Sequence, residues 1–274
     1  MNIEEEVVVI TGGLNGLGRC IADTYALRGV STVVLDIGIK QGEEGESAEG
    51  WIGYKCDVGN QAEVEAVWQR LVKEVGMPTV IINNAAVFDG RPFSELSMEE
   101  IERVYRINTF SHHHINSLFL PPLLASKKGG HIVTISSVLG YFGASRLSTY
   151  TASKAALIAF HTSLRSELAV SAPQIRTILV TSGELDTQMF AGLKQSRFQR
   201  FLGPVVEVKE LAVRIVGMIE RGEAGHISLP AYAEWSSVLD ALPVGLKQMF
   251  RQVSGVDTAM TEAMVESRIR KGAL

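Results

Sequence analysis

A tyrosine and a lysine stand at the spacing that brings two side chains together on one face of a helix. Tyr150 and Lys154 are four positions apart, and residues at i and i+4 of a helix are neighbours. A free phenol titrates at about pH 10, too high for efficient proton transfer at neutral pH, but a nearby ammonium stabilises its anion. The pair therefore indicates acid–base chemistry, and Ser137, thirteen residues before Tyr150, is placed to orient a substrate oxygen.

A second group of residues is suited to binding phosphates. The glycine-rich stretch Thr11–Gly18 follows the apolar run Val7–Ile10 and precedes a helical pattern, which predicts a strand, a turn and a helix. Such a turn directs backbone N–H groups and a helix N-terminus at a pyrophosphate. A phosphate-binding turn together with an activated phenol is what a nicotinamide-dependent oxidoreductase of alcohols and ketones requires.

In their order and spacing these elements resemble the classical short-chain dehydrogenase/reductase family, over about residues 6–230. The family pattern T-G-x-x-x-G-x-G is matched at Thr11, Gly12, Gly16 and Gly18, and the family's N-N-A-G stretch appears at 83–86 with Ala86 in place of glycine. A further departure follows the sixth predicted strand, where Ser182 stands in place of the usual proline.

The resemblance implies a catalytic tetrad of Asn108, Ser137, Tyr150 and Lys154. In such a tetrad Tyr150 is the general acid/base, and Lys154 stabilises its anion and reaches the nicotinamide ribose. Ser137 holds the substrate oxygen, and Asn108 holds a water that relays protons toward Lys154. Consecutive histidines 112–114 are not expected to bind a metal, because neighbouring helical residues point about 100° apart.

The expected cofactor is NAD, with NADP less favoured. Asp36 ends the second predicted strand, where a carboxylate accepts hydrogen bonds from the adenosine ribose and repels a 2′-phosphate. No Arg or Lys occupies positions 13–15 to offset that repulsion. Asp57 matches the family aspartate that meets the adenine amino group. The full set of expected cofactor contacts is Gly12, Asn15, Gly16, Leu17, Gly18, Asp36, Asp57, Val58, Asn84, Ala85, Tyr150, Lys154, Gly183 and Thr187.

Composition agrees with a globular enzyme that acts on a small molecule. The chain has 274 residues, 46% of them hydrophobic, and a net charge of −4, which offers no basic surface for nucleic acid. Cys20 and Cys56 are the only cysteines and suggest a reducing compartment. No apolar run is long enough to span a membrane, and the N-terminus is acidic. We therefore expect a cytoplasmic protein, with peripheral contact to a membrane or lipid droplet as an alternative.

Short β-rich runs alternate with helical patterns, which predicts a doubly wound (Rossmann) α/β fold. We expect a single domain with a parallel seven-stranded sheet and helices on both faces. The expected strands are 7–10, 32–35, 53–56, 80–82, 131–135, 176–180 and 226–229. Helices are expected to begin after Asn60 and Ser97 and near Asn108, with Pro121-Pro122 kinking or ending the last of these. Residues 38–50 are expected to form a surface loop.

Residues 1–230 are expected to form the dinucleotide-binding catalytic domain, and residues 231–274 a C-terminal extension. This extension is rich in large apolar residues and resembles the subgroup that includes retinol dehydrogenases and certain 17β-hydroxysteroid dehydrogenases. A substrate lid, a membrane-surface helix, a dimer contact and ordinary core all remain open for it. The apolar residues are Tyr232, Trp235, Val238, Leu239, Leu242, Leu246, Met249 and Phe250.

The expected reaction is hydride transfer between NAD(H) and an alcohol, ketone or aldehyde, with a lipophilic substrate such as a retinoid, steroid or fatty alcohol. The alternatives are an NADPH-dependent ketoreductase of a biosynthetic pathway and a non-catalytic dinucleotide-binding protein; the complete tetrad argues against the second. Glu184 is expected to be exposed to solvent or to contact a polar part of the substrate. A homodimer or tetramer is expected, with Leu157, Phe160 and Leu164 on the outward face of their helix.

Overall fold

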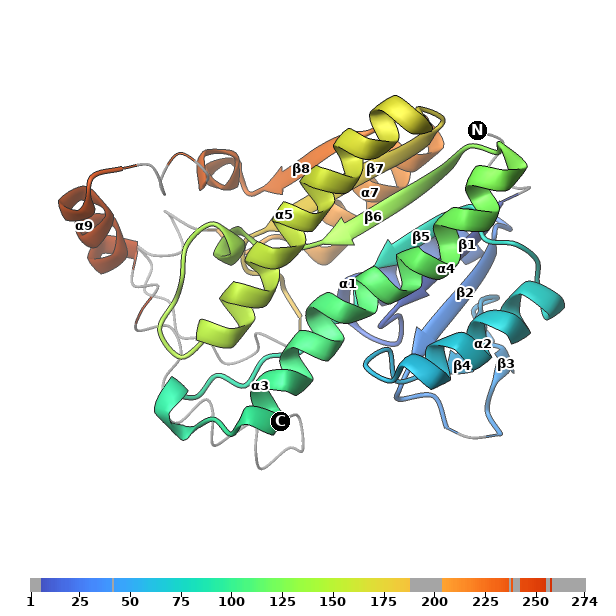
Figure 1. The fold of residues 1–274 in the computed structure, drawn as a ribbon, viewed down its shortest axis with the longest axis horizontal. Coiled ribbons are helices and arrows are strands. Elements are labelled where there is room, and N and C mark those ends of the chain that lie inside the picture. The colour runs from blue at the N-terminus through green and yellow to red at the C-terminus, as the bar shows by residue number, and fades with distance from the viewer. Residues whose placement is uncertain are drawn as a thin grey trace.

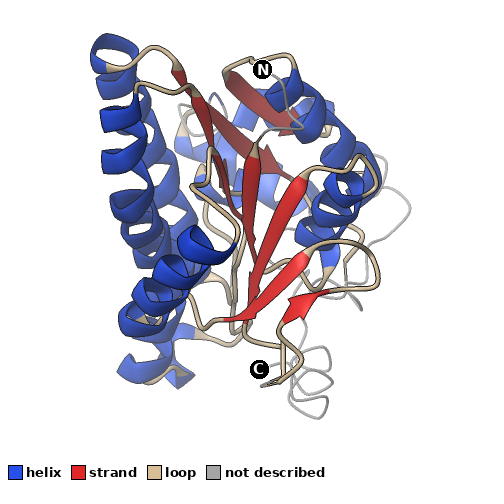
Figure 2. Cartoon of the chain, turned by 90° about the vertical axis from the view of Figure 1, so that its right-hand side faces the viewer, coloured by secondary structure: helices blue, strands red, loops and turns tan. Residues whose placement is uncertain are grey.

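A single eight-stranded sheet forms the centre of the computed structural model, which describes residues 6–40, 42–187, 204–236, 238, 242–254 and 257. The strand order is β3-β4-β2-β1-β5-β6-β7-β8 (Figure 1), and helices lie on both sides of the sheet (Figure 2). Its strands are β1 Val7–Thr11, β2 Ser31–Asp36, β3 Gly45–Glu46, β4 Ile52–Lys55, β5 Val80–Asn83, β6 Gly130–Ile135, β7 Ile175–Ser182 and β8 Gly225–Leu229. The seven expected strands are all present and parallel, which confirms the doubly wound fold.

The eighth strand corrects one expectation. Within the segment 38–50, predicted to be a loop, β3 pairs antiparallel with β4 at the edge of the sheet. Glu44 holds this edge in place, because its carboxylate accepts from the Lys55 backbone N–H at 3.1 Å and meets the Arg70 guanidinium at 3.0 Å. A two-residue strand carries too little apolar alternation to be visible in the sequence.

Helices cover both faces of the sheet, and each face has its own core. Residues of α1 and α7 pack with side chains such as Val8 and Ile10 in one core, whereas residues of α2, α4 and α5 pack with Val9 and Ile81 in the other. The helices are α1 Gly16–Ala26, α2 Gln61–Glu74, α3 Met98–Tyr105, α4 Ser111–Ser126, α5 Ser148–Ser171, α7 Val208–Glu220 and α9 Val244–Ser254. Short 3₁₀ turns are η2 Phe93–Glu95, η4 Val138–Gly140 and η6 Ala231–Trp235, and η3 Arg106–Phe110 is a π turn.

Two predicted helix starts are confirmed. The Asn60 side chain accepts from the backbone N–H groups of Ala62 and Glu63, and Ser97 and Glu100 form a reciprocal capping box. Each arrangement satisfies N–H groups that have no partner inside the helix.

The expectation of a helix starting near Asn108 is wrong. Segments α3, η3 and α4 follow one another without a break over residues 98–126, so Asn108 lies in the middle of a long helical run. Pro121 and Pro122 lie inside α4 and do not end it. Phe119 and Leu123, on either side of the prolines, are fully buried, and this packing offsets a proline cost of about 3 kcal/mol in a helix.

The predicted outward face of α5 is also corrected. Leu157 is completely buried and Leu164 packs in the core, while Phe160 is partly buried and stacks on His113 with ring centroids 3.9 Å apart. Leu157, Phe160 and Leu164 therefore pack within the chain itself.

Candidate active site

The glycine-rich turn brings the N-terminus of α1 against the carboxyl end of the sheet. Gly12 and Gly16 have φ of 66° and 56°, which favour glycine. A Cβ on Gly12 would lie 2.9 Å from the Ala85 Cα, and one on Gly18 would overlap the Gly12 carbonyl oxygen. Asn84 fixes the turn from the neighbouring strand, since its Nδ2 donates to the Thr11 and Gly12 carbonyl oxygens, each at 2.9 Å.

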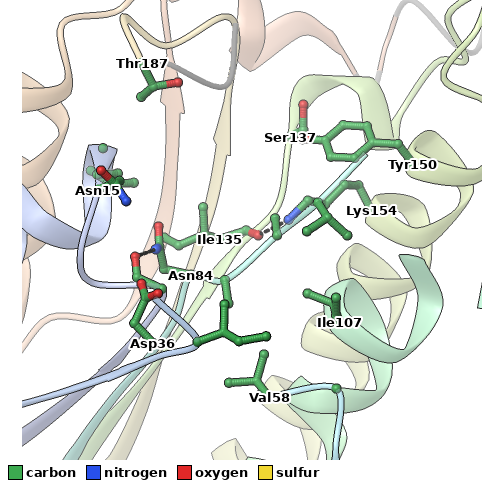
Figure 3. Close-up of a pocket in the computed structure, with 18 of the residues that line it drawn as sticks. Asn15, Asp36, Val58, Asn84, Ile107, Ile135, Ser137, Tyr150, Lys154 and Thr187 are labelled. Carbon is green, nitrogen blue, oxygen red and sulfur yellow. Dashed lines mark hydrogen bonds between the residues drawn. The ribbon is translucent and has the colours of Figure 1, made fainter. Parts of the chain in front are cut away.

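A cavity of about 440 Å³ opens at this edge of the sheet. It extends from the glycine turn and Asp36 to Ser137, Tyr150 and Lys154 (Figure 3). Of the residues predicted to form the site, the cavity lining includes Gly12, Asn15, Gly16, Leu17, Asp36, Asp57, Val58, Asn84, Ala85, Ser137, Tyr150, Lys154, Gly183 and Thr187. Gly18 and Asn108 are the two that do not line it; both support residues that do.

Asp36 is the last residue of β2, and Asp57 lies just after β4. The Asp36 carboxylate accepts from the Leu14 N–H at 3.0 Å and the Gly38 N–H at 2.9 Å. Each oxygen of a carboxylate can accept more than one hydrogen bond, so Asp36 keeps capacity for a ligand. Asp57 accepts from the Gly59 N–H at 2.8 Å, which shapes the turn that carries Val58 to the cavity.

Asn108 ties the long helical run to the loop after β5. Its Oδ1 accepts from the Val87 N–H at 2.8 Å, and its Nδ2 donates to the Val87 carbonyl at 2.9 Å and to the Ser153 hydroxyl at 3.0 Å. The side chain is fully buried. The π turn, a feature often found at functional sites, thus places Asn108 next to α5.

Tyr150 is almost completely buried beside the cavity. Its ring packs edge-on against Phe88 with centroids 5.7 Å apart. Burial raises the pKa of the phenol to about 12, and a hydrogen bond with Ser137 acts in the opposite direction. The Ser137 hydroxyl itself accepts from the Leu139 N–H at 3.2 Å. The neighbouring Ser136 hydroxyl donates to the Lys154 carbonyl at 2.9 Å, whereas the Ser137 hydroxyl donates to the Ser182 carbonyl at the longer distance of 3.5 Å, so Ser137 is the serine whose hydroxyl turns more easily to a ligand.

Lys154 is buried within reach of the same phenol. Its Nζ donates to the Ile135 carbonyl at 2.9 Å and lies 5.8 Å from the centre of the Tyr150 ring. Burial lowers the pKa of the Lys154 ammonium to about 7. The two groups are thus shifted in opposite directions by desolvation, and a charge on either one favours the opposite charge on the other.

The loop after β7 closes the far side of the cavity. The Gly183 N–H donates to the Leu229 carbonyl at 2.7 Å, and the Val206 N–H donates to the Glu184 carbonyl at 2.8 Å. Glu184 is partly buried, which corrects the expectation of an exposed side chain. Thr187 lines the cavity, and its buried hydroxyl has no hydrogen-bond partner among the described residues.

Several lining residues were not predicted from the sequence. Arg103, Arg106 and Ile107 lie on the α3–η3 segment, one to five positions before Asn108. The Arg106 guanidinium is 3.7 Å from Glu102, and the Arg103 guanidinium is 4.0 Å from Asp89. A helix that begins near Asn108 does not include these residues. Their spacing from Ser97, where another helix was expected to begin, could have placed them on a helix.

The cavity fits a nicotinamide dinucleotide. The turn has no side chain where a Cβ would block the approach to the backbone, and Asp36 stands at the end of the cavity where a ribose would be held. At the other end the Thr187 hydroxyl, which has no partner in the part of the chain that the structure describes, offers a hydrogen bond to a polar ligand.

Comparison with known proteins agrees with this geometry. An uncharacterized oxidoreductase of Saccharomyces cerevisiae, TDA5, is 33% identical over 262 residues, covering 93% of this chain and 78% of the yeast protein. Human retinol dehydrogenase 10 is 33% identical over 236 residues, covering 74% of this chain and 69% of that protein. A short chain dehydrogenase from Burkholderia cenocepacia, solved in complex with NADP, has the same fold, with a TM-score of 0.73 at 23% identity over 93% of this chain and 99% of that one.

The model of one protein family matches most of the chain. It is described as short chain dehydrogenase and matches residues 6–197, the segment that contains the glycine turn, Ser137, Tyr150 and Lys154. The chain is therefore a member of the short-chain dehydrogenase/reductase family, a nicotinamide dinucleotide-dependent oxidoreductase.

Proposed function

We propose that this enzyme transfers a hydride between NAD(H) and a lipophilic alcohol or the corresponding ketone or aldehyde. The observation that carries the proposal is the placement of the buried Tyr150 phenol and the Lys154 ammonium in one cavity with the glycine turn and Asp36 (Figure 3). Proton transfer and dinucleotide binding would then occur within the same cavity.

The proton chemistry follows from the burial of the two groups. Tyr150 gives its phenolic proton to the substrate oxygen during reduction and removes it during oxidation. A phenol with a pKa of about 12 needs its anion stabilised, and the charged form of Lys154 supplies this at a site that excludes water. Ser137 donates to the substrate oxygen and orients it. When bound, the nicotinamide supplies or accepts the hydride.

Asn108 acts here as a positioning residue. Its side chain is committed to Val87 and Ser153, so we assign it the role of fixing the π turn against α5. Both Nδ2 hydrogens are already donated, so a water bound by this side chain would have to use the second lone pair of Oδ1.

We infer a preference for NAD over NADP from Asp36. Its carboxylate lines the cavity at the end of β2 and is anchored by two backbone N–H groups, so it cannot easily turn away from a 2′-phosphate. Lys40, the nearest cation after β2 in the sequence, pairs with Glu43 at 3.3 Å. The rival, an NADPH-dependent ketoreductase, is favoured by the NADP bound to the Burkholderia enzyme, whose identity to this chain is low.

The lipophilic substrate is inferred from the extension 231–274 and from the retinol dehydrogenase among the relatives. Trp235 and Val238 are 67% and 51% exposed, and Met249 of α9 is 58% exposed. Exposure of this kind excludes ordinary core packing for these three side chains. Leu239 lies outside the described residues. We propose that the extension forms a lid that closes over a lipophilic substrate and excludes water from the site of hydride transfer.

Peripheral membrane contact and self-association are further parts of the proposal. Among the described helices, none is both long and apolar enough to cross a bilayer. The exposed Trp235 and Met249 suit contact with a lipid surface.

For a homodimer or tetramer we propose the surface around Phe110, which is 60% exposed at the start of α4. Sedimentation at micromolar concentration tests this, and a strictly monomeric profile would contradict it.

The direct test of the reaction is a screen of lipophilic primary and secondary alcohols with NAD and with NADP, following the absorbance of reduced nicotinamide. We expect turnover with NAD that increases with the apolar size of the alcohol. Turnover only of ketones with NADPH would favour the biosynthetic ketoreductase, and dinucleotide binding with no turnover of any alcohol, ketone or aldehyde would favour a non-catalytic binding protein.

A further inference from the structure

Three polar side chains meet at the ends of β7 and β8, next to the cavity but not in its lining. Thr181 and Ser228 lie opposite each other in the parallel pairing, and His226, two residues before Ser228, shares its face of β8. The Thr181 Oγ1 lies 2.6 Å from the His226 Nε2 and 2.8 Å from the Ser228 Oγ. The Ser228 Oγ lies 3.0 Å from the same nitrogen. We call these three residues the strand-end cluster.

The cluster satisfies two hydroxyl groups that the fold buries. Thr181 is completely buried and Ser228 is 7% exposed, whereas His226 is exposed to solvent. Each hydroxyl can donate one hydrogen bond and accept others, so the three groups serve as partners for one another. Thr177, four residues earlier on the same face of β7, has a buried hydroxyl with no partner among the described residues. The hydroxyl contacts of Thr181 are therefore specific to the end of this strand.

The strand-end cluster lies beside the residues with which β7 enters the site. Ser182 lines the cavity, and its carbonyl accepts from the Ser137 hydroxyl at 3.5 Å. Gly183 also lines the cavity, and its N–H donates to the Leu229 carbonyl at 2.7 Å. The side-chain bonds of the cluster thus precede this backbone bond on both strands. A displacement of Thr181 would be passed directly to Ser182 and Gly183.

Ser182 stands at a point where the backbone needs restraint. It occupies the position at which the family pattern has proline. A proline fixes φ near −65° and reduces the freedom of the chain, whereas a serine leaves this torsion variable. Beyond it, Gly183, Leu185 and Thr187 line the cavity, and we call residues 183–187 the cofactor-binding loop. The restraint on this loop has to come from neighbouring contacts, and the cluster is bonded to the adjacent Thr181.

We propose that the strand-end cluster positions the cofactor-binding loop and supplies the restraint that Ser182 lacks. Thr181, His226 and Ser228 are positioning residues, because they act on the cavity through Ser182 and Gly183. Without their bonds the loop would adopt more conformations in the cofactor-free protein, and NAD would have to order it at a cost in affinity. The inference rests on the proposed binding of NAD in this cavity.

The first test removes the hydroxyl that two of the bonds share. Thr181→Val keeps the shape of the side chain, and Thr177→Val is the matched control on the same strand face. Calorimetric titration measures the affinity for NAD. We expect the Kd to rise about fivefold in Thr181→Val and to stay within about twofold of the wild-type value in Thr177→Val. A folded Thr181→Val protein with wild-type affinity for NAD would overturn the proposal.

A proline at position 182 separates positioning from a general loss of packing. Ser182→Pro supplies the restraint by another route, so the Thr181→Val/Ser182→Pro double variant should recover most of the lost affinity. In the wild-type background Ser182→Pro should change the Kd by less than about twofold, because the cluster already restrains the loop. A folded double variant that binds NAD no better than Thr181→Val would contradict the proposal, since proline cannot replace packing lost at Thr181.

Substitution of the exposed His226 gives a test that needs neither the buried variants nor the cofactor. Hydrogen–deuterium exchange of residues 181–187 is measured without NAD in the wild type, His226→Leu and His226→Gln. We expect faster exchange in His226→Leu and a rate near the wild-type value in His226→Gln, whose amide can donate and accept. Equal exchange in all three proteins would refute the positioning role. If exchange differed as expected but the wild type bound no NAD, the proposed function would fail and the role of the cluster would stand.

Discussion

The Tyr232 hydroxyl lies directly against Gly183: a Cβ added to this glycine would be 2.5 Å from the Tyr232 oxygen and 3.5 Å from its ring carbon Cζ. Gly183 belongs to the loop that carries Thr187 to the cavity, and Tyr232 is the second residue of the C-terminal extension. The start of the extension therefore supports the cofactor-binding loop from behind. A boundary after residue 230 cuts through this contact.

Gly183→Ala tests this contact. The added methyl group would push the loop toward the cavity, so we expect NAD to bind about tenfold more weakly. Removing the opposing oxygen in a Gly183→Ala/Tyr232→Phe double variant should restore most of the affinity, since the ring carbon would then be at an ordinary contact distance of 3.5 Å and Pro230 Cδ, at 3.1 Å, would need only a small shift. Calorimetric titration of the wild type, both single variants and the double variant gives the coupling energy, expected at about 1 kcal/mol. Additive effects would show that the two residues do not act together.

Lys154→Met should stabilise the fold while removing activity. Burial lowers the pKa of Lys154 from its ordinary value to about 7, so the unfolded chain holds this proton more tightly than the folded one. Below pH 7 the buried lysine therefore lowers the free energy of unfolding by its full amount. This reduction becomes smaller as the pH rises from about 7 to 10.

For this variant we expect a gain in the free energy of unfolding on the order of 4 kcal/mol below pH 7, less the loss of the bond to Ile135. The gain should shrink toward pH 10. Denaturant unfolding of both proteins at several pH values measures it, and a variant less stable than the wild type at neutral pH would argue against a desolvated ammonium.

Asp36→Ala should relax the preference for NAD. The substitution removes ribose hydrogen bonds and the repulsion of a 2′-phosphate, each worth about 1–3 kcal/mol. It also frees the Leu14 and Gly38 N–H groups, which can then meet an anionic ligand. Titration of NAD and NADP into both proteins decides the matter; wild-type protein that binds NADP as tightly as NAD would refute the assignment of Asp36.

A truncation after Ser236 examines the lid. It retains Tyr232, which supports the loop that carries Gly183 and Thr187. A truncation at Ala231 would remove this support. If residues 237–274 cover a lipophilic substrate, the shortened enzyme should bind NAD normally and lose kcat/KM for long-chain or ring alcohols more than for short ones. Equal losses for all alcohols would place the extension outside substrate binding.

Most of the candidate site residues could be predicted to lie together because they follow successive parallel strands. Asp36, Asn84 and Ser137 each stand at or just beyond a strand's carboxyl end, and in a parallel sheet these ends meet at one edge. The four-residue spacing of Tyr150 and Lys154 needed only a helix to become a contact. Patterns of this kind are local, so they can be read without the fold.

Other features depend on tertiary packing and could not be read in this way. The π turn that places Asn108 against Ser153 has no local sequence pattern, and Leu157, predicted to face outward, is completely buried in the packed fold. The contact between Gly183 and Tyr232 joins segments 49 residues apart.

Tyr150 is proposed to transfer the proton, whereas the glycine turn and Asp36 are proposed to provide most of the contacts that hold the dinucleotide. Tyr150→Phe removes the phenolic oxygen and keeps the ring that packs against Phe88, so its effect on turnover is cleanly separated from its effect on folding. The most direct measurement is kcat of this variant alongside calorimetric titration of NAD. We predict a loss of about 10²–10⁴ in kcat with nearly unchanged NAD affinity, and a variant that kept more than about a tenth of the wild-type kcat would contradict the assignment.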